Sequence, residues 1–207
     1  MRYRALIRLI LVVTLLLAVG ACGNDDKDTD EAISLSQSLP VDLGELGTLV
    51  VHYPEGWFSN VSTGGPFIPM LFIGLATDPA LFDEGWSDHE FTQGEMGVMI
   101  LAGDSSEEGA TVVDTLAEFI VPDGQNADTG LTFSDIETFD ANGKPAAIAS
   151  GVGAENGITT GGIVTAVQIE ELFVVLMFSL HPDEVEANLA LSRAITSQLE
   201  RRESEDG

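Results

Sequence analysis

A long apolar hairpin near the C-terminus constrains the fold more than any other feature of the sequence. Two runs of β character, residues 158–170 and 171–180, follow each other directly, and Leu172 to Leu180 reads LFVVLMFSL. A run this continuously apolar is typical of a central strand that is covered on both faces. The hairpin therefore predicts a sheet buried between two layers.

Further runs of β character precede the hairpin, and turn-forming residues separate them. They cover residues 46–53, 67–76, 94–102 and 131–139. In the third run, apolar residues alternate at period two from Met96 to Ala102. The sequence Asp140-Ala141-Asn142-Gly143 is typical of a tight hairpin turn, after which a strand returns over residues 144–152. Strands joined by such turns predict an antiparallel sheet.

Two segments have the periodicity of amphipathic helices. Thr111 is expected to be the N-cap of a helix that ends at Ile120. The last helix is expected to begin at Pro182, capped by His181, because proline is favoured at the first helical position. Its predicted inner stripe consists of Val185, Leu189, Ser192, Ile195 and Leu199, and its negative end is expected near Arg201 and Arg202. A short helix is also compatible with residues 79–84.

The predicted order of elements is β-β-β-α-β-β-β-β-α. It favours an α+β domain, in which an antiparallel sheet of about six to seven strands is sandwiched by helices.

The first 22 residues combine three features of a secreted lipoprotein. Arg2, Arg4 and Arg8 make the start positive, and an apolar run of signal-peptide length follows from Leu9 to Ala21. Residues 19–22, VGAC, resemble the bacterial lipobox, whose cysteine is acylated. Cys22 is the only cysteine of the chain. We therefore expect a signal peptide over residues 1–21, lipidation of Cys22 and a location on the extracytoplasmic face of the cell membrane.

The remaining chain divides by composition. Residues 22–40 are polar, acidic and rich in serine, which predicts a disordered tether behind the acylated cysteine. Its alternating aspartates do not complete a calcium-binding loop, because Glu31 and Gln37 stand where that loop needs glycine and glutamate. The globular domain is expected over residues 41–200 and a polar tail over residues 201–207.

Four features of the domain occur together along the sequence. They are Tyr53-Pro54-Glu55-Gly56-Trp57 after the first strand, the helix at 111–120, Asn142-Gly143-Lys144-Pro145-Ala146, and the terminal helix after a long hairpin. With these features the domain resembles the PsbP/DcrB-like superfamily. The resemblance covers roughly residues 41–200. It implies a sheet sandwiched between helices in a small extracytoplasmic or adaptor protein without catalysis. Members of the superfamily include photosystem II subunits and binders of a small GTPase, but none of their functional residues can be matched to positions here.

The charge of the chain excludes one class of partner. All 34 acidic residues follow residue 21, together with five of the eight basic ones, so the chain from Cys22 onward has a formal net charge of −29. Affinity for nucleic acid comes from cationic groups that displace counterions. We therefore expect no nucleic-acid partner, and docking to anionic lipid through a basic patch is equally disfavoured.

Loop 83–95, DEGWSDHEFTQGE, is the stretch that combines the most polar and aromatic groups. Its candidate residues for binding a cation or a partner are Asp83, Glu84, Asp88, His89 and Glu90. The alternative interpretation is an exposed acidic loop that its aromatic rings hold against the domain. The three histidines are far apart in sequence and form no zinc motif.

These features favour a membrane-anchored, non-enzymatic lipoprotein that binds or assembles with a protein partner. The alternative is a binding module for a small ligand or divalent cation that uses loop 83–95. No catalytic residue, resident metal or cofactor is predicted.

Overall fold

The computed structural model describes residues 33–63, 71–84, 89–104, 109–120, 131–155 and 157–203. The chain divides into two units, residues 1–33 and 34–207. Of the first unit only Ile33 is described, so the predicted signal peptide, Cys22 and most of the predicted tether lie outside the described residues. In the part of the chain that is described, no helix has both the length and the hydropathy needed to cross a membrane.

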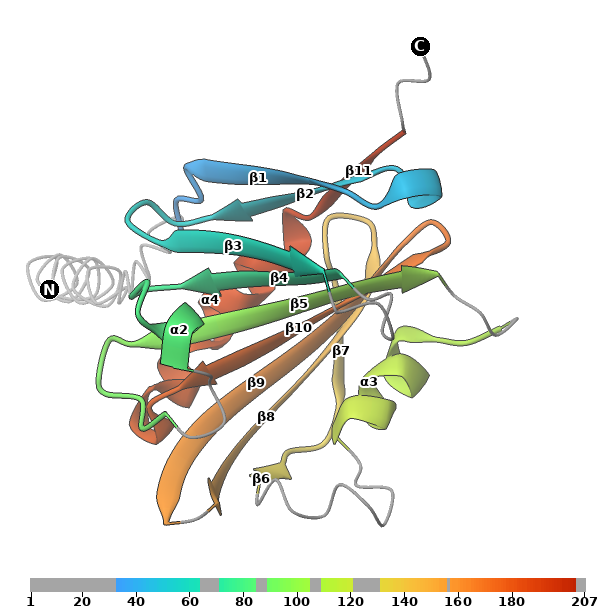
Figure 1. Ribbon diagram of the computed structural model, residues 1–207. Helices are drawn as coiled ribbons and strands as arrows, with labels where there is room; N and C mark the ends of the chain where they lie inside the picture. The colour runs from blue at the N-terminus through green and yellow to red at the C-terminus, as the bar shows by residue number, and fades with distance from the viewer. Residues whose placement is uncertain are drawn as a thin grey trace, which may run out of the picture. The chain divides into compact units, whose positions relative to one another are not determined.

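An eight-stranded antiparallel sheet dominates the second unit (Figure 1). Its order is β3 (Phe58–Thr63), β4 (Leu71–Ala76), β5 (Met96–Asp104), β10 (Leu172–Leu180), β9 (Ile158–Ile169), β8 (Pro145–Glu155) and β6 (Leu131–Phe133), and β7 (Glu137–Asp140) also pairs with β8. The predicted hairpin is β9–β10, and β10 lies between β5 and β9. The prediction of a central, doubly covered strand is confirmed, since seven of its nine residues are buried.

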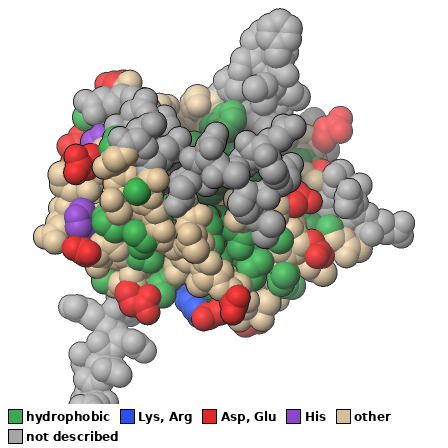
Figure 2. Space-filling model, turned by 90° about the horizontal axis from the view of Figure 1, so that it is seen from below, with side chains coloured by type: hydrophobic (Ala, Val, Ile, Leu, Met, Phe, Trp, Pro, Cys, Tyr) green, Lys and Arg blue, Asp and Glu red, His purple; other side chains and the backbone are tan. Residues whose placement is uncertain are grey.

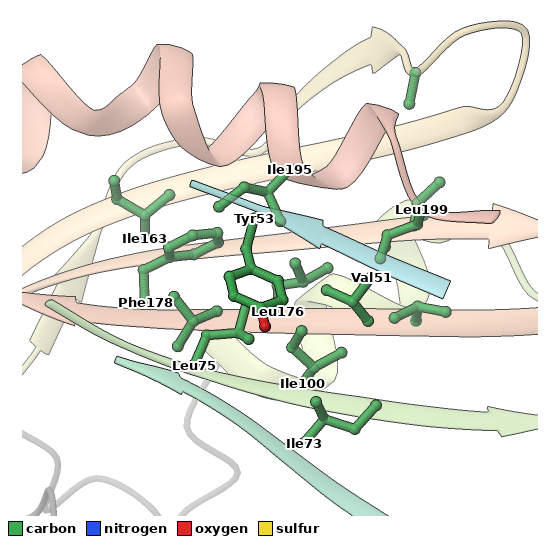
Figure 3. Packing of buried hydrophobic residues seen from close by; sticks show 14 of the residues in the cluster. Val51, Tyr53, Ile73, Leu75, Ile100, Ile163, Leu176, Phe178, Ile195 and Leu199 are labelled. Atoms are coloured by element: carbon green, nitrogen blue, oxygen red, sulfur yellow. The ribbon is translucent and has the colours of Figure 1, made fainter. Parts of the chain in front are cut away.

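The first face of this sheet is covered by helix α4 (Val185–Ser197) and by a second sheet of three strands. The second sheet has the order β1 (Gln37–Asp42), β2 (Thr48–Tyr53) and β11 (Glu200–Arg202). Figure 3 shows Val51 and Tyr53 of β2 and Ile195 of α4 directed toward Leu176 on the large sheet. The main hydrophobic core therefore lies between these layers.

The second face carries α3 (Val112–Ile120), which packs on β8, β9 and β10. Thr111 caps α3 as predicted, because its Oγ1 accepts a hydrogen bond from Asp114 N at 3.2 Å. The Asp114 carboxylate accepts one from Thr111 N at 3.0 Å in return. Leu116 of α3 is fully buried against the sheet.

Two predicted boundaries are wrong, because both ends of the domain add strands to β2. Residues 37–40, assigned to the disordered tether, belong to β1, whose Leu39 packs against the core. Arg201 and Arg202, assigned to the polar tail, belong to β11, in which the Arg201 guanidinium donates from Nε to Leu46 O at 2.7 Å. The sequence does not predict either strand, because residues 37–40 and 200–202 are mostly polar. In addition, β11 is remote in sequence from its partner β2.

The number of strands also differs from the expected six to seven. The run 131–139 is two short strands, β6 and β7, and β3 follows directly after the Trp57 turn. The predicted 140–143 turn is confirmed: Asn142 and Gly143 both have positive φ, at 58° and 82°. The fold class, α+β with a large antiparallel sheet, is as predicted.

Candidate functional site

The acidic loop begins at the short helix α2 (Leu81–Glu84), which is anchored by apolar side chains. Leu81 is buried with Phe91 and Ala76. Phe82 packs so closely beside Gly74 that a Cβ on Gly74 would lie only 2.9 Å from the Phe82 ring. Asp83 is exposed. Residues 85–88, with Asp88, lie outside the described residues, as does the side chain of Glu84. The alternative interpretation of the loop was that its aromatic rings hold it against the domain. The burial of Phe91 confirms this for that ring.

His89 is held by two contacts within the loop. Its Nε2 lies 3.3 Å from Oε2 of Glu95, and its ring meets that of Phe91 edge to face, with 4.9 Å between centroids. The Glu95 carboxylate also accepts a hydrogen bond from Thr92 N at 2.7 Å. The Thr92 backbone bond, more than His89, holds the pKa of Glu95 below its usual value, against the effect of burial.

The loop is joined to the C-terminal helix by one long-range contact. Gly94 N donates to both carboxylate oxygens of Glu184, at 3.1 and 3.0 Å. Glu184 ends the 3-10 turn η4 (Pro182–Glu184), which His181 caps by accepting from Asp183 N at 3.3 Å. Ninety residues separate Gly94 from Glu184, so no local sequence signal could have predicted this contact.

Of the five predicted site residues, the structure describes the side chains of Asp83, His89 and Glu90. His89 pairs with Glu95, which was not predicted, while Asp83 and Glu90 are exposed. The Thr92–Glu95 spacing, typical of a capping box, was the signal that could have identified Glu95. Among the described residues, no group of three or more His, Cys, Asp or Glu side chains is placed to hold a metal ion. The cation alternative involves Glu84 and Asp88 and stays a prediction.

The basic side chains of the described residues form a separate set of contacts. Lys144 donates from Nζ to Ser197 O at 2.9 Å and to Leu199 O at 2.8 Å, and burial lowers its pKa. Arg201 bonds to Glu170 and Glu171 in the β9–β10 turn. The cations are thus bonded to the C-terminal end of α4 and to neighbouring turns and strands.

Arg193 belongs to the same set of cations. It pairs with Glu137 at 3.0 Å and lies over the ring of Phe139, 5.2 Å from its centroid. Beside it a hollow of about 30 Å³ is lined by Ser134, Ile148, Ser150 and Leu189. This volume is about that of a single water molecule.

The remaining histidine, His52, lies on β2. Its Nε2 is buried without a hydrogen-bond partner among the described residues, and the nearest carboxylate oxygen is Oε1 of Glu200, 3.8 Å away on β11. Figure 2 shows histidines beside acidic side chains on one face of the molecule. Each of the three histidines is thus within 4 Å of a carboxylate oxygen.

Comparison with solved structures shows the fold of the domain. Cyanobacterial PsbP (CyanoP) from Synechocystis sp. PCC 6803 matches with a TM-score of 0.52 and 12% identity, over 83% of this chain and 96% of that chain. LpqN of Mycobacterium tuberculosis, described as involved in cell envelope biogenesis, matches with a TM-score of 0.52 and 18% identity, over 79% of this chain and 89% of that chain. No protein-family model matches the sequence, and no curated protein matches it either. The likeness supports the predicted PsbP-like fold.

Proposed function

We propose that this protein is a non-enzymatic module of the cell envelope, held on the outer face of a membrane by lipid on Cys22, which binds a protein partner. The signal peptide and lipobox support the anchor. The likeness to PsbP and LpqN supports the module, because the solved LpqN is described as a protein of cell envelope biogenesis.

The observation that carries the proposal is that four side chains able to take part in chemistry, those of His89, Lys144, His181 and Arg201, are bonded within the domain. His181 caps the start of the C-terminal helix, and His89 packs on Phe91 beside Glu95. Lys144 and Arg201 donate to backbone carbonyls that end other elements. A general base must instead face the proton that it removes from a substrate. These four groups hold the scaffold together, and the proposal therefore places partner binding on the exposed carboxylates.

The exposed carboxylates around loop 83–95 are the proposed binding surface. Asp83, Glu90 and Asp183 are exposed. The Glu184 bond to Gly94 and the packing of Phe91 fix the loop on which Glu90 lies. A fixed acidic surface favours a partner with basic side chains, and the attraction is screened beyond about 8 Å at physiological salt.

Site-specific photocrosslinking in intact cells tests this surface. A crosslinker at Glu90 is expected to give one defined protein adduct, whereas the same group at exposed Asp135 gives none. Combining it with Asp83→Asn is expected to lower the adduct yield severalfold, since each rim charge contributes to association. Equal adducts at both positions, or none at Glu90, would contradict the proposed surface.

A further inference from the structure

Strand β3 is an exposed edge of the large sheet. Among the described strands it pairs only with β4, so within the described part of the chain the N–H and C=O groups of its other edge have no strand partner. Every described side chain of β3, from Phe58 to Ser62, is exposed. Two of the few large apolar side chains at the surface are here: Phe58 is 44% exposed and Val61 is 42% exposed.

The other edge strands carry features that oppose pairing with another chain. β1 contains Pro40 and Asp42, β6 is only three residues long, and β11 consists of Glu200, Arg201 and Arg202. Proteins use proline, charge and short length in this way to blunt the edges of sheets.

β3 has none of these features. Its six residues, FSNVST, include no proline and no charge. The uncharged stretch extends over residues 56–77, in a chain in which 20% of residues are charged. An exposed, uncharged edge of this length is an open site for strand addition.

We propose that β3 pairs antiparallel with β3 of a second copy, so that one sheet continues through both copies. In such a pair each residue faces another residue of the same strand, and a charge near the centre would face a like charge. Centred on Asn60, the pairing places Phe58 opposite Ser62 and Ser59 opposite Val61, with no charge in any pair. The charged residues nearest in sequence are Glu55 and Asp78, which lie outside the paired residues 58–62.

A cysteine scan of the full chain in its own membrane tests the pairing. Single cysteines replace Ser59, Asn60, Val61 and Ser62 in turn, and mild oxidation follows. Covalent dimer is expected to peak at the strand centre, Asn60, where facing Cα atoms lie about 4.5–5.5 Å apart. Two positions away the yield should fall at least tenfold, because each step from the centre separates the two thiols by about 7 Å. The unchanged chain, in which the single cysteine Cys22 is acylated in the proposed form, gives the background.

Two matched variants distinguish pairing from chance contact. Val61→Lys, in the chain with cysteine at Asn60, should lower the dimer yield at least tenfold, because lysine blunts an edge. Val152→Lys changes a valine of equal exposure, 43%, on β8 and should leave the yield unchanged. No dimer at any of the four positions, equal yields at all of them, or crosslinks only to another protein would overturn the proposal. The readout is contact between copies, so its failure is distinct from failure of partner binding.

Discussion

In this domain, single charged side chains donate hydrogen bonds to the backbone carbonyls at the ends of helices. The sequence predicts Arg201 and Arg202 near the negative end of the last helix, whereas the cation bonded there is Lys144, from a hairpin more than 50 residues earlier. Arg201 instead donates to Leu46 O and bonds to Glu170 and Glu171. Helix dipoles favour a cation at the C-terminal end, but which cation arrives there depends on the tertiary structure.

Lys144→Met should destabilise the domain. It removes both hydrogen bonds to the carbonyls of Ser197 and Leu199, and a bond from a charged donor contributes roughly 1.5–3 kcal/mol. We expect the free energy of unfolding, measured in urea, to fall by about 2 kcal/mol. Arg202→Met, which removes an exposed pair with Glu200, should change it by less than about 0.5 kcal/mol. Equal effects of the two variants would contradict this role of Lys144.

Glu95 should contribute to acid sensitivity. Its pKa is lower in the folded state, so its stabilising effect is full above the ordinary carboxyl pKa of about 4.3 and is lost as pH falls through the folded value. We expect Glu95→Gln to lower the free energy of unfolding by about 1 kcal/mol at pH 7, with the difference shrinking as pH falls through the folded pKa of Glu95. Glu90→Gln removes an exposed carboxylate of the same loop and is the control, which should change the free energy of unfolding at pH 7 by less than about 0.5 kcal/mol. A constant difference from pH 7 to pH 3 would show that Glu95 acts through packing alone.

At the scale of elements, short sequence signals predict the hairpin, turn and caps, which are formed by contacts between residues close in sequence. The β9–β10 hairpin, the Asn142-Gly143 turn, the Thr111 cap and the Pro182 start are each encoded within a few residues. The sequence does not predict strands β1, β3 and β11, because they are polar or short. They become strands through pairing with neighbouring strands. The link from Gly94 to Glu184 was missed because the two residues are distant in sequence.

The cap of α3 is one element whose contribution can be measured. Thr111→Ala removes the oxygen that accepts from Asp114 N and should cost about 1 kcal/mol. Thr111→Ser keeps that oxygen and should retain most of the stability. Thermal unfolding of the two variants compares them directly, and an equal loss for both would contradict the cap.

The docking of the C-terminal helix depends on a glycine in β9. A Cβ at Gly161 would lie 2.5 Å from Cγ2 of Val185 and 3.1 Å from Cα of Pro182, so Gly161→Ala should cost roughly 1–3 kcal/mol by overpacking. Gly103→Ala on β5 meets no atom within 4 Å and should be close to neutral. Urea unfolding of both variants tests this close approach between Gly161 and the helix. A Gly161 variant as stable as the Gly103 variant would contradict it.

At the scale of the whole molecule, an acidic domain with a PsbP-like fold follows residues 1–22, which are predicted to be a signal peptide and an acylated cysteine. The fold class could be predicted from strand periodicity and helix caps, because these patterns repeat along the sequence. The candidate site could be predicted only in part, since the hydrogen bond that holds Gly94 joins it to Glu184, which is distant in sequence. In the proposed arrangement the tether ends where β1 begins at Gln37, and β1 and β11 flank β2.

The central claim is that the mature chain begins at an acylated Cys22. Mass spectrometry of the protein purified from membranes tests it most directly. We predict an N-terminal peptide that starts at Cys22 and carries the mass of more than one acyl chain, because two membrane signals are what stable anchoring needs. Recovery of a chain that keeps Met1, or of an unmodified Cys22 in the membrane fraction, would contradict the account.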